Sequence, residues 1–327
     1  MEFTRLRKYR KNEIIRNLFA ETQLSVKDMI LPFFVIDGKN KKEPISSMPG
    51  IYRLSIDLLI KEIQEVKNLG VNTFLLFGLA DRKNTTGSQS YSKDGIIQKA
   101  IKQIKDKIEN AVIITDVCLC GHTTHGHCGI VKKEKKNRFY IDNDETIKIL
   151  AEIAISHAES GADFVAPSAM MDGQVKKIRQ SLDSNNFYNI GIMGYSAKYA
   201  SAFYGPFRDA LDSKPQFGDR KTYQMDFRNS QQALKEIEAD IKEGADIVMV
   251  KPALSYLDII KIAKEKFKFP LSAYNVSGEY SMIKFACQQG LFKEKDIVME
   301  ILTSIKRAGA DFLITYFAKE VAKWIQD

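Results

Sequence analysis

The most reactive stretch of the sequence is a short segment rich in cysteine. Three of the four cysteines, Cys118, Cys120 and Cys128, fall within eleven residues. Residues two apart in an extended segment point the same way, so the first two thiols can reach one ion, and a glycine-containing loop can bring the third back to it. Three thiolates without an obvious fourth protein ligand are typical of a zinc site that keeps an open coordination position.

Other interpretations of this segment remain open from the residues alone. Three of the four histidines, His122, His125 and His127, lie in the same segment, and one of them could complete the metal shell. A cluster of free or redox-active thiols is an alternative to a metal site. An iron–sulfur cluster usually needs a fourth cysteine. The remaining one, Cys287, lies in a helical pattern that favours a place in the core.

Two lysines stand where predicted strands end. Lys251 follows the apolar run 246–250, and Lys198 ends the preceding predicted strand. Burial lowers the pKa of a lysine, and strands only roughly 5 Å apart would make two ammonium groups repel each other. A neutral amine attacks a ketone to form a Schiff base. An arbitrary lysine is ordinarily a solvated surface charge, but the strand-end positions favour a function here.

Further polar side chains follow the ends of predicted strands. They are Asp116, Ser168, Tyr274, Ser277 and Tyr316. Arg208 and Arg220 lie in an irregular stretch of roughly thirty residues after Lys198, and loops of that length are often active-site lids. Each arginine alone would ordinarily be a surface charge, but guanidinium groups bind carboxylates through two parallel hydrogen bonds.

The elements that must position these residues alternate between strands and helices. Eight apolar runs without polar alternation indicate strands buried on both faces of a parallel sheet; they are Leu31–Ile36, Thr73–Phe77, Val112–Val117, Phe164–Ala166, Ile190–Met193, Ile247–Val250, Leu271–Tyr274 and Phe312–Thr315. Helical patterns separate them, including Asp57–Leu69, Asp144–Ser160, Ser230–Glu243 and Asp296–Ala308.

This alternation predicts an α/β fold, a (β/α)₈ TIM barrel. An open doubly wound sheet is the alternative, although no Gly-x-Gly-x-x-Gly follows the first strand and no phosphate loop is present. A Gly-Ala-Asp sequence recurs at 161–163, 244–246 and 309–311, each time between a predicted helix and a predicted strand. Glycine there supplies a left-handed helix cap before the next strand begins.

Length and composition restrict the class of protein. The chain has 327 residues, of which 44% are hydrophobic, so it can bury a large core and is not disordered. We expect a basic, irregular N-terminal arm over residues 1–27, which makes oligomer contacts, and one catalytic barrel domain over residues 28–327. The net charge of +8 is mild for this length. It suits acidic small molecules as well as nucleic acid.

Membrane and nucleic-acid functions are not expected. No run approaches the ~20 apolar residues that span a bilayer. The N-terminus lacks an apolar stretch of signal-peptide length, so we expect a soluble, cytoplasmic protein. The basic run Lys132–Arg138 has no interleaved aromatic residues on a recognisable nucleic-acid-binding fold, which favours a solvated loop.

At these residues the sequence resembles the porphobilinogen synthase family, also called 5-aminolevulinate dehydratase, of the zinc-binding type. The Cys118–Cys120 and His125–Cys128 segments resemble its zinc motif, and Met249–Ala253 resembles its Schiff-base lysine signature. Further matches, in the family's order, are Arg5–Arg7, Ala166–Ser168, Met171–Gly173, Gly194–Tyr199, Ala202–Arg208, Gly218–Lys221, Tyr256–Asp258 and Val276–Glu279. The resemblance covers essentially the whole chain.

The resemblance implies a TIM barrel with an N-terminal arm, commonly assembled as a homo-octamer. The implied reaction condenses two molecules of 5-aminolevulinate into porphobilinogen with loss of two waters, in tetrapyrrole (haem) biosynthesis. Lys251 would form the Schiff base, Lys198 would act as a second amine, and Asp116 would orient an amino group or a water. Substrate contacts would come from Arg208, Arg220, Ser277, Tyr316, Gln224, Tyr274, Ser168 and Phe203.

The resemblance also implies metals. Zinc would bind Cys118, Cys120 and Cys128 and polarise a substrate carbonyl or hold a hydroxide. Some members carry aspartates there and rely on magnesium, so the cysteines predict zinc dependence here. Glu236 matches the position of an allosteric magnesium ligand in many bacterial members. The segment departs from the family after Cys120, where Gly121-His122 stands in place of proline or glutamate followed by tyrosine.

Two rival functions follow from the same residues. A class I aldolase would also use a barrel lysine and a Schiff base, but it explains neither the clustered cysteines nor the second strand-end lysine. A metal-storage or metal-sensing protein would use the cysteine and histidine cluster without catalysis, and it predicts that Lys251 is inert.

Overall fold

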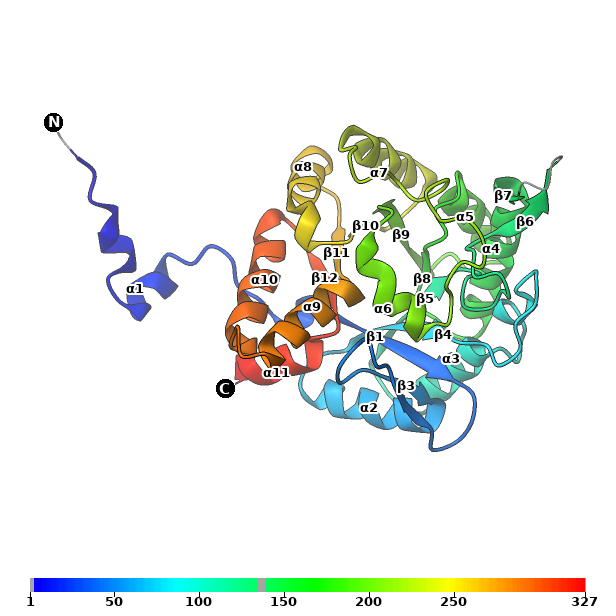
Figure 1. Cartoon of the computed structure of the whole chain (residues 1–327), viewed down its shortest axis with the longest axis horizontal. Helices are drawn as coiled ribbons and strands as arrows, with labels where there is room; N and C mark the ends of the chain where they lie inside the picture. The colour runs from blue at the N-terminus through cyan, green and yellow to red at the C-terminus, as the bar shows by residue number, and fades with distance from the viewer. Residues whose placement is uncertain (1–2, 135–138, 327) are drawn as a thin grey trace.

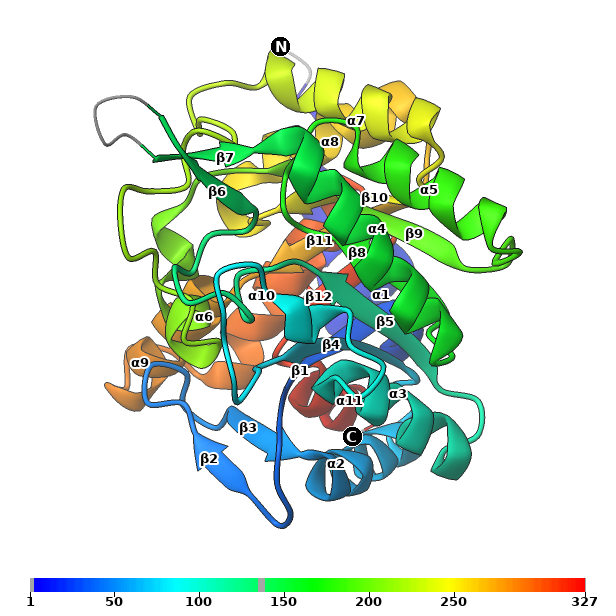
Figure 2. The ribbon, with the colours of Figure 1, turned by 90° about the vertical axis from the view of Figure 1, so that its right-hand side faces the viewer.

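The computed structural model describes residues 3–134 and 139–326, and its central feature is a closed barrel of eight parallel strands (Figures 1 and 2). Pairing of the last strand with the first closes it, which excludes the open doubly wound sheet. The barrel strands are β1 (Met29–Ile36), β4 (Thr73–Gly78), β5 (Val112–Val117), β8 (Phe164–Pro167), β9 (Gly191–Lys198), β10 (Ile247–Lys251), β11 (Leu271–Asn275) and β12 (Phe312–Thr315).

All eight predicted strands are confirmed, and a helix follows each of them. These helices are α2 (Ile56–Asn68), α3 (Ile96–Lys107), α4 (Asn143–Glu159), α5 (Gln174–Ser184), α7 (Gln231–Glu243), α8 (Leu257–Phe267), α10 (Glu294–Ala308) and α11 (Ala318–Gln326). The four predicted helices correspond to α2, α4, α7 and α10 within two residues at each end. The chain therefore repeats the strand–helix unit eight times, as a TIM barrel requires.

Smaller elements extend the barrel. Strands β2 (Lys42–Pro44) and β3 (Tyr52–Ser55) continue the sheet beside β1, and β6 (Ile130–Lys133) pairs with β7 (Phe139–Asp142) as a separate ribbon (Figure 2). Of the predicted basic loop Lys132–Arg138, the first two residues lie in β6, and 135–138 lie outside the described residues. Two further helices, the short α6 (Gly205–Ala210) and the longer α9 (Ser277–Gln288), begin close after the ends of β9 and β11.

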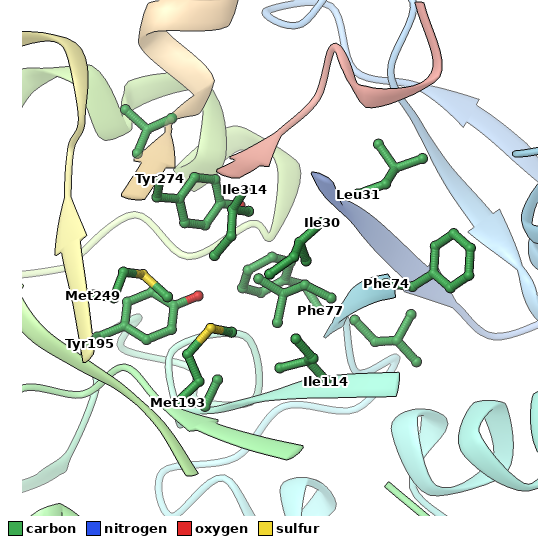
Figure 3. Packing of buried hydrophobic residues seen from close by; sticks show 14 of the residues in the cluster. Ile30, Leu31, Phe74, Phe77, Ile114, Met193, Tyr195, Met249, Tyr274 and Ile314 are labelled. Carbon is green, nitrogen blue, oxygen red and sulfur yellow. The ribbon is translucent and has the colours of Figure 1, made fainter. Parts of the chain in front are cut away.

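The barrel interior is filled by side chains from alternating strand positions. Met193, Tyr195, Met249 and Tyr274 point toward one another inside it (Figure 3). Each of these side chains is fully buried. Since successive residues of a strand point to opposite faces, the next positions along pack outward against the helices. The barrel is therefore a packed core whose reactive groups can lie only at its ends.

A bulge in β9 changes which of its residues face inward. Val248 of β10 pairs with Gly194, but Val250 pairs with Ala197, so one extra residue of β9 is accommodated between them. A bulge of this kind re-aims the side chains that follow it. Tyr195 and Lys198, three residues apart, consequently both lie on the inner side, which strict alternation does not allow.

The three Gly-Ala-Asp sequences tie neighbouring strands together at the start of the barrel. Each glycine has a positive φ, as predicted for a left-handed helix cap. Each aspartate accepts a hydrogen bond from a backbone N–H at the start of the preceding barrel strand: Asp163 from Ile113 (2.6 Å), Asp246 from Ile192 (2.7 Å) and Asp311 from Leu271 (2.8 Å).

The N-terminal arm projects away from the barrel (Figure 1). The expectation of irregular chain is wrong in part, because η1 (Leu6–Arg10) and α1 (Glu13–Leu18) form single helical turns. Its apolar side chains face outward, with Ile14 81% and Leu18 78% exposed. Across the described residues, no helix combines the length and the apolar character needed to cross a bilayer.

Candidate active site

The two predicted lysines meet at the carboxyl end of the barrel. Lys251 of β10 is the direct partner of Lys198 of β9, and they are only 3% and 6% exposed. Lys198 donates from Nζ to the carbonyl oxygen of Ser168 at 2.5 Å. Burial, followed by the positive charge of Lys198, holds the pKa of Lys251 well below its usual range. Lys251 is therefore the amine better prepared to act as a nucleophile.

Aromatic rings enclose the Lys251 ammonium. Its Nζ lies 4.2 Å from the ring centroid of Tyr274, 4.9 Å from that of Phe207, 5.0 Å from that of Tyr195 and 5.3 Å from that of Tyr204. Ring faces attract a cation, while the rings themselves exclude water. The rings therefore keep the amine of Lys251 away from bulk solvent.

Asp116 lies beside the lysines. It is partly buried, and desolvation raises its pKa to about 6, against the opposing effects of a hydrogen bond from Ser168 and the positive charges of both lysines. Its Oδ1 has no hydrogen-bond partner among the described residues. A buried carboxylate oxygen left unpaired is available to a ligand group.

The three cysteines converge as predicted from their spacing. Their Sγ atoms all lie within 4.8 Å of one another, those of Cys118 and Cys120 are 3.5 Å apart, and all three side chains are buried. A tetrahedral zinc with Zn–S bonds near 2.3 Å places sulfurs roughly 3.8 Å apart. Hydrogen bonds from Cys118 and Cys120 hold the pKa of Cys128 well below its usual range. The donor set and spacing therefore fit a zinc ion.

The histidines do not complete this set. The cluster consists of the cysteines alone within the described part of the chain. His125 Nδ1 instead accepts from the backbone N–H of His127, and His127 contacts the carbonyl of Phe217 (2.9 Å) and the hydroxyl of Tyr223 (3.1 Å). His122 is buried with its Nδ1 unpartnered in the described structure. The possibility that one of the three ligates the metal is therefore not supported.

A cavity of about 640 Å³ lies over the strand ends and contains the predicted arginines. Arg208, Arg220, Gln224 and Phe203 all line it. Gln224 is 3% exposed, yet neither end of its amide has a partner among the described residues. Two guanidinium groups and a free amide in one cavity are well suited to bind a carboxylate. Arg208 lies on helix α6 rather than in the irregular loop that the sequence predicted.

The segment that carries Arg220 is anchored to the cysteine-containing loop. Arg220 donates from Nη2 to the carbonyl oxygens of Gly126 (2.8 Å) and Ser213 (2.7 Å). Together with the two His127 contacts, these bonds join residues 213–223 to the loop that ends at Cys128. The carboxylate cavity and the thiol cluster are thus held in one rigid arrangement.

Tyr274 contacts Lys251 directly, and Ser277 contacts Phe207, another ring beside that lysine. The Tyr274 and Tyr316 hydroxyls are 3.1 Å apart. The Ser277 hydroxyl donates to the carbonyl of Phe203 (3.2 Å) and accepts from the N–H of Phe207 (3.0 Å), so it holds the segment before α6. A substrate carboxylate at Ser277 would compete with these bonds.

Glu236 lies apart from the lysines, on α7, in a second cavity of about 800 Å³ that Asp172 and Glu243 also line. It is half-buried, and burial raises the pKa of its carboxyl group. Cys287 lies on α9, as its helical pattern predicted, and is partly buried against the core.

Sequence reasoning missed several residues of the site, namely Tyr195, Tyr204, Phe207, Tyr223 and Glu279. Tyr195 precedes Lys198 by three positions, so the alternation of a regular strand placed it on the opposite face, and only the bulge in β9 reverses this. Tyr204 and Phe207 carried a signal in the Ala202–Arg208 motif, although their contact with Lys251 depends on how α6 folds back over the barrel.

Comparisons with known proteins point to one family. The profile of the family described as "Delta-aminolevulinic acid dehydratase" matches residues 3–324. Similar curated proteins of that name come from Bacillus subtilis, 51% identical over 325 residues and 99% of each chain, and from Methanothermus sociabilis, 55% identical over 323 residues and 99% of each chain.

A solved structure is similar over nearly the full length. It is the delta-aminolevulinic acid dehydratase (porphobilinogen synthase) of Toxoplasma gondii ME49 in complex with the reaction product porphobilinogen, with a TM-score of 0.95 and 46% identity over 99% of this chain and 92% of that one. This chain therefore belongs to the delta-aminolevulinic acid dehydratase family, the porphobilinogen synthases.

Proposed function

We propose that this chain condenses two molecules of 5-aminolevulinate into porphobilinogen and two waters, with Lys251 as the Schiff-base residue. The observation that carries the proposal is the buried pair Lys251 and Lys198 at the carboxyl end of the barrel. The amine of Lys251 attacks the ketone carbon of one substrate, and the ketone oxygen leaves as water when the iminium forms. The rival aldolase and metal-storage functions lack the family match.

The neighbouring groups have complementary tasks in this proposal. Lys198 would donate a proton to the departing ketone oxygen, because it is the direct strand partner of Lys251 and its ammonium group has donors beyond the one used by the Ser168 carbonyl. Arg208 and Arg220, with Gln224, would bind one substrate carboxylate in the cavity that they line. Asp116, beside both lysines, would orient the amino group of the second substrate.

Cys118, Cys120 and Cys128 would hold a zinc ion, because three buried sulfurs within 4.8 Å of one another are soft ligands that a single zinc ion can bridge. Zinc bound there supplies a Lewis acid for a substrate carbonyl. We also assign Glu236 to an allosteric magnesium site. Its support is a half-buried carboxylate in a cavity with other acidic side chains.

The test combines product formation with trapping of the Schiff base. Purified protein is incubated with 5-aminolevulinate, assayed colorimetrically for porphobilinogen, and in parallel reduced with borohydride and mapped by mass spectrometry. We expect product and an adduct at Lys251. Lys251→Ala should abolish both, whereas Lys198→Ala should keep a slow adduct at Lys251 but lose turnover. Wild-type protein without product or adduct would overturn the proposal.

The metal assignment has its own readout. Cys120→Ala should lose bound zinc, measured by elemental analysis, together with most of the activity. Activity that persists in that variant under strict chelation would retain the enzyme but refute zinc dependence. Magnesium should raise the wild-type rate and have no effect on Glu236→Gln; equal activation of both would refute the Glu236 assignment.

A further inference from the structure

Glu279, in the first turn of α9, is a carboxylate buried at the active-site end of the barrel. It is 0% exposed, and no ion pair among the described residues includes it. Removing a carboxylate from water is costly unless hydrogen bonds replace its hydration. In this structure the hydrogen bonds come from the loop after β10 and from the end of β11, so the carboxylate connects these two segments.

The two carboxylate oxygens join two different strand ends. Oε1 accepts from the backbone N–H of Leu254 at 2.8 Å, three residues after Lys251. Oε2 accepts from the N–H of Val276 at 2.9 Å and from the side-chain amide of Asn275 at 3.0 Å. The loop that follows β10 is therefore tied directly to the end of β11.

Asn275 extends the connection to the next strand. Its Oδ1 accepts from the hydroxyl of Thr315 at 3.0 Å, and that hydroxyl accepts from the N–H of Phe317 at 3.2 Å. Asn275 and Thr315 are 1% and 0% exposed, so water does not share these bonds. One buried polar chain thus links the carboxyl ends of β10, β11 and β12. These ends carry Lys251, Tyr274 and Tyr316.

Helix capping does not account for all of these contacts. A glutamate in the third position of a helix commonly accepts from the N–H of the preceding cap residue, here Val276. The bonds to Leu254 and Asn275 have no part in such a cap, and Leu254 is 25 residues away in sequence. A capping role alone does not require a fully buried carboxylate, because the same cap bond can be made at the surface.

We propose that Glu279 is a positioning residue for the reaction at Lys251: it sets the spacing between Lys251 and the Tyr274–Tyr316 pair by tying together the strand ends that carry them. This inference rests on the proposed function. Leu254 follows Lys251 by only three residues, so a shift of the loop at Leu254 would strain the segment that leads to the lysine. The Lys251 carbonyl also accepts from the Tyr204 hydroxyl (3.1 Å) and the Tyr199 N–H (3.0 Å), which fixes the lysine backbone from the side of β9 and α6.

The chain offers a matched pair of variants whose carboxylates hold the two ends of the same strand, β11. Glu279→Gln keeps the size but turns one acceptor oxygen into a donor, which must face either Leu254 or the Asn275 and Val276 donors. Asp311→Asn makes the same kind of change at the opposite end of β11, where Asp311 accepts from the N–H of Leu271 (2.8 Å) and from Lys264 (2.6 Å). Both changes should lower the melting temperature.

Only the Glu279 variant should impair chemistry. With saturating 5-aminolevulinate, Glu279→Gln is expected to slow borohydride-trapped adduct formation at Lys251 and kcat at least tenfold, while Asp311→Asn stays within twofold of wild type. A Glu279→Gln enzyme that melts earlier but keeps its trapping rate and kcat within twofold would overturn the proposal. Absence of product and adduct in the wild type would instead refute the proposed function.

A second pair covers the case in which Glu279→Gln does not fold. Thr315→Val removes the hydroxyl that joins Asn275 to β12 and should lower kcat severalfold, whereas Thr315→Ser keeps the hydroxyl and should restore it to near the wild-type value. Equal kcat in these two variants would contradict the positioning role, because a merely structural methyl-packing effect does not depend on the hydroxyl.

Discussion

At the scale of single residues, burial decides the chemistry of the titratable groups. Lys251 and Lys198 are ordinary charged side chains in water, but here they are almost entirely buried, with the partly buried Asp116 beside them. Charges in such surroundings act strongly on one another, since little water screens them. The depressed pKa of Lys251 and the raised pKa of Asp116 are two results of the same enclosure.

His157 provides a residue-scale prediction on stability. It is 2% exposed in the last turn of α4, its Nδ1 lies 3.0 Å from the Thr115 hydroxyl, and burial lowers its pKa to about 3. An unfolded histidine has a pKa of about 6.5. Between these values the unfolded chain binds the extra proton, so the free energy of unfolding falls as the pH decreases below about 6.5, by up to about 1.4 kcal/mol per pH unit.

The measurement is urea unfolding at pH 7.5 and at pH 5.5. His157→Gln should lose roughly 1 kcal/mol less than wild type between these pH values. Part of the slope should remain, because burial also lowers the pKa of His122, to about 4. The same pH dependence in variant and wild type would show that His157 does not titrate on unfolding.

At the scale of elements, short local features set the direction of side chains and the pairing of strands. The bulge in β9 brings Lys198 to the inner side of the barrel beside Lys251. The Gly-Ala-Asp turns act at the opposite end, where each aspartate holds the neighbouring strand by its first N–H groups. The carboxyl ends of the strands therefore carry the reactive side chains, and hydrogen bonds at the amino ends of the same strands stabilise the barrel.

Asp163→Ala tests this division. The variant leaves the N–H of Ile113 and the ammonium of Lys105 without their 2.6 Å partner, which should cost about 1–3 kcal/mol of unfolding free energy. Because the change lies at the far end of the barrel, kcat and KM should stay close to wild type. Chemical denaturation and steady-state kinetics measure the two effects, and a loss of kcat without a loss of stability would contradict the division.

The anchoring of residues 213–223 gives a second element-scale prediction. Tyr223→Phe removes the hydroxyl that contacts His127 Nδ1 but leaves the cysteines unchanged. Loss of about 1 kcal/mol from this anchor should raise the KM for 5-aminolevulinate roughly fivefold, because the segment carries Arg220. Zinc content should stay at the wild-type level; a variant that loses zinc instead would show that the hydroxyl supports the thiol cluster.

At the scale of the whole molecule, closure of the barrel brings distant segments to one rim. The cysteines, Lys198, Lys251 and Tyr316 come from strands or loops spread over about two hundred residues. Parallel strands all end on the same side, so each strand contributes to one common site. The arm is the exception, since it projects outward with its apolar side chains exposed (Figure 1).

We predict that this arm assembles the protein with further copies of the chain, an octamer by the family's pattern. Ile14→Asp combined with Leu18→Asp changes two side chains that are 81% and 78% exposed and should not disturb the barrel. Analytical ultracentrifugation should then show a smaller assembly than wild type, while circular dichroism stays the same. An unchanged assembly mass would show that the arm has no part in association.

The sequence by itself determined the order of the elements and the residues of the reactive centre. Buried parallel strands must be continuous apolar runs, so the eight strands were visible, and parallel strands end on one side, so Lys198, Lys251 and Asp116 were expected to meet. The spacing of Cys118, Cys120 and Cys128 also predicted their convergence, because an extended chain repeats its direction every second residue.

Only the tertiary structure decided which groups surround that centre. Regular strand alternation would put Tyr195 and Lys198 on opposite faces, and the bulge that brings them to the same side appears only in the pairing of β9 with β10. The partners of His127 and Glu279 come from segments about 90 and 25 residues away, and hydrogen bonds over such distances depend on how the barrel closes. Local periodicity reports which face of an element is buried, whereas the identity of the contacting side chain requires the packed fold.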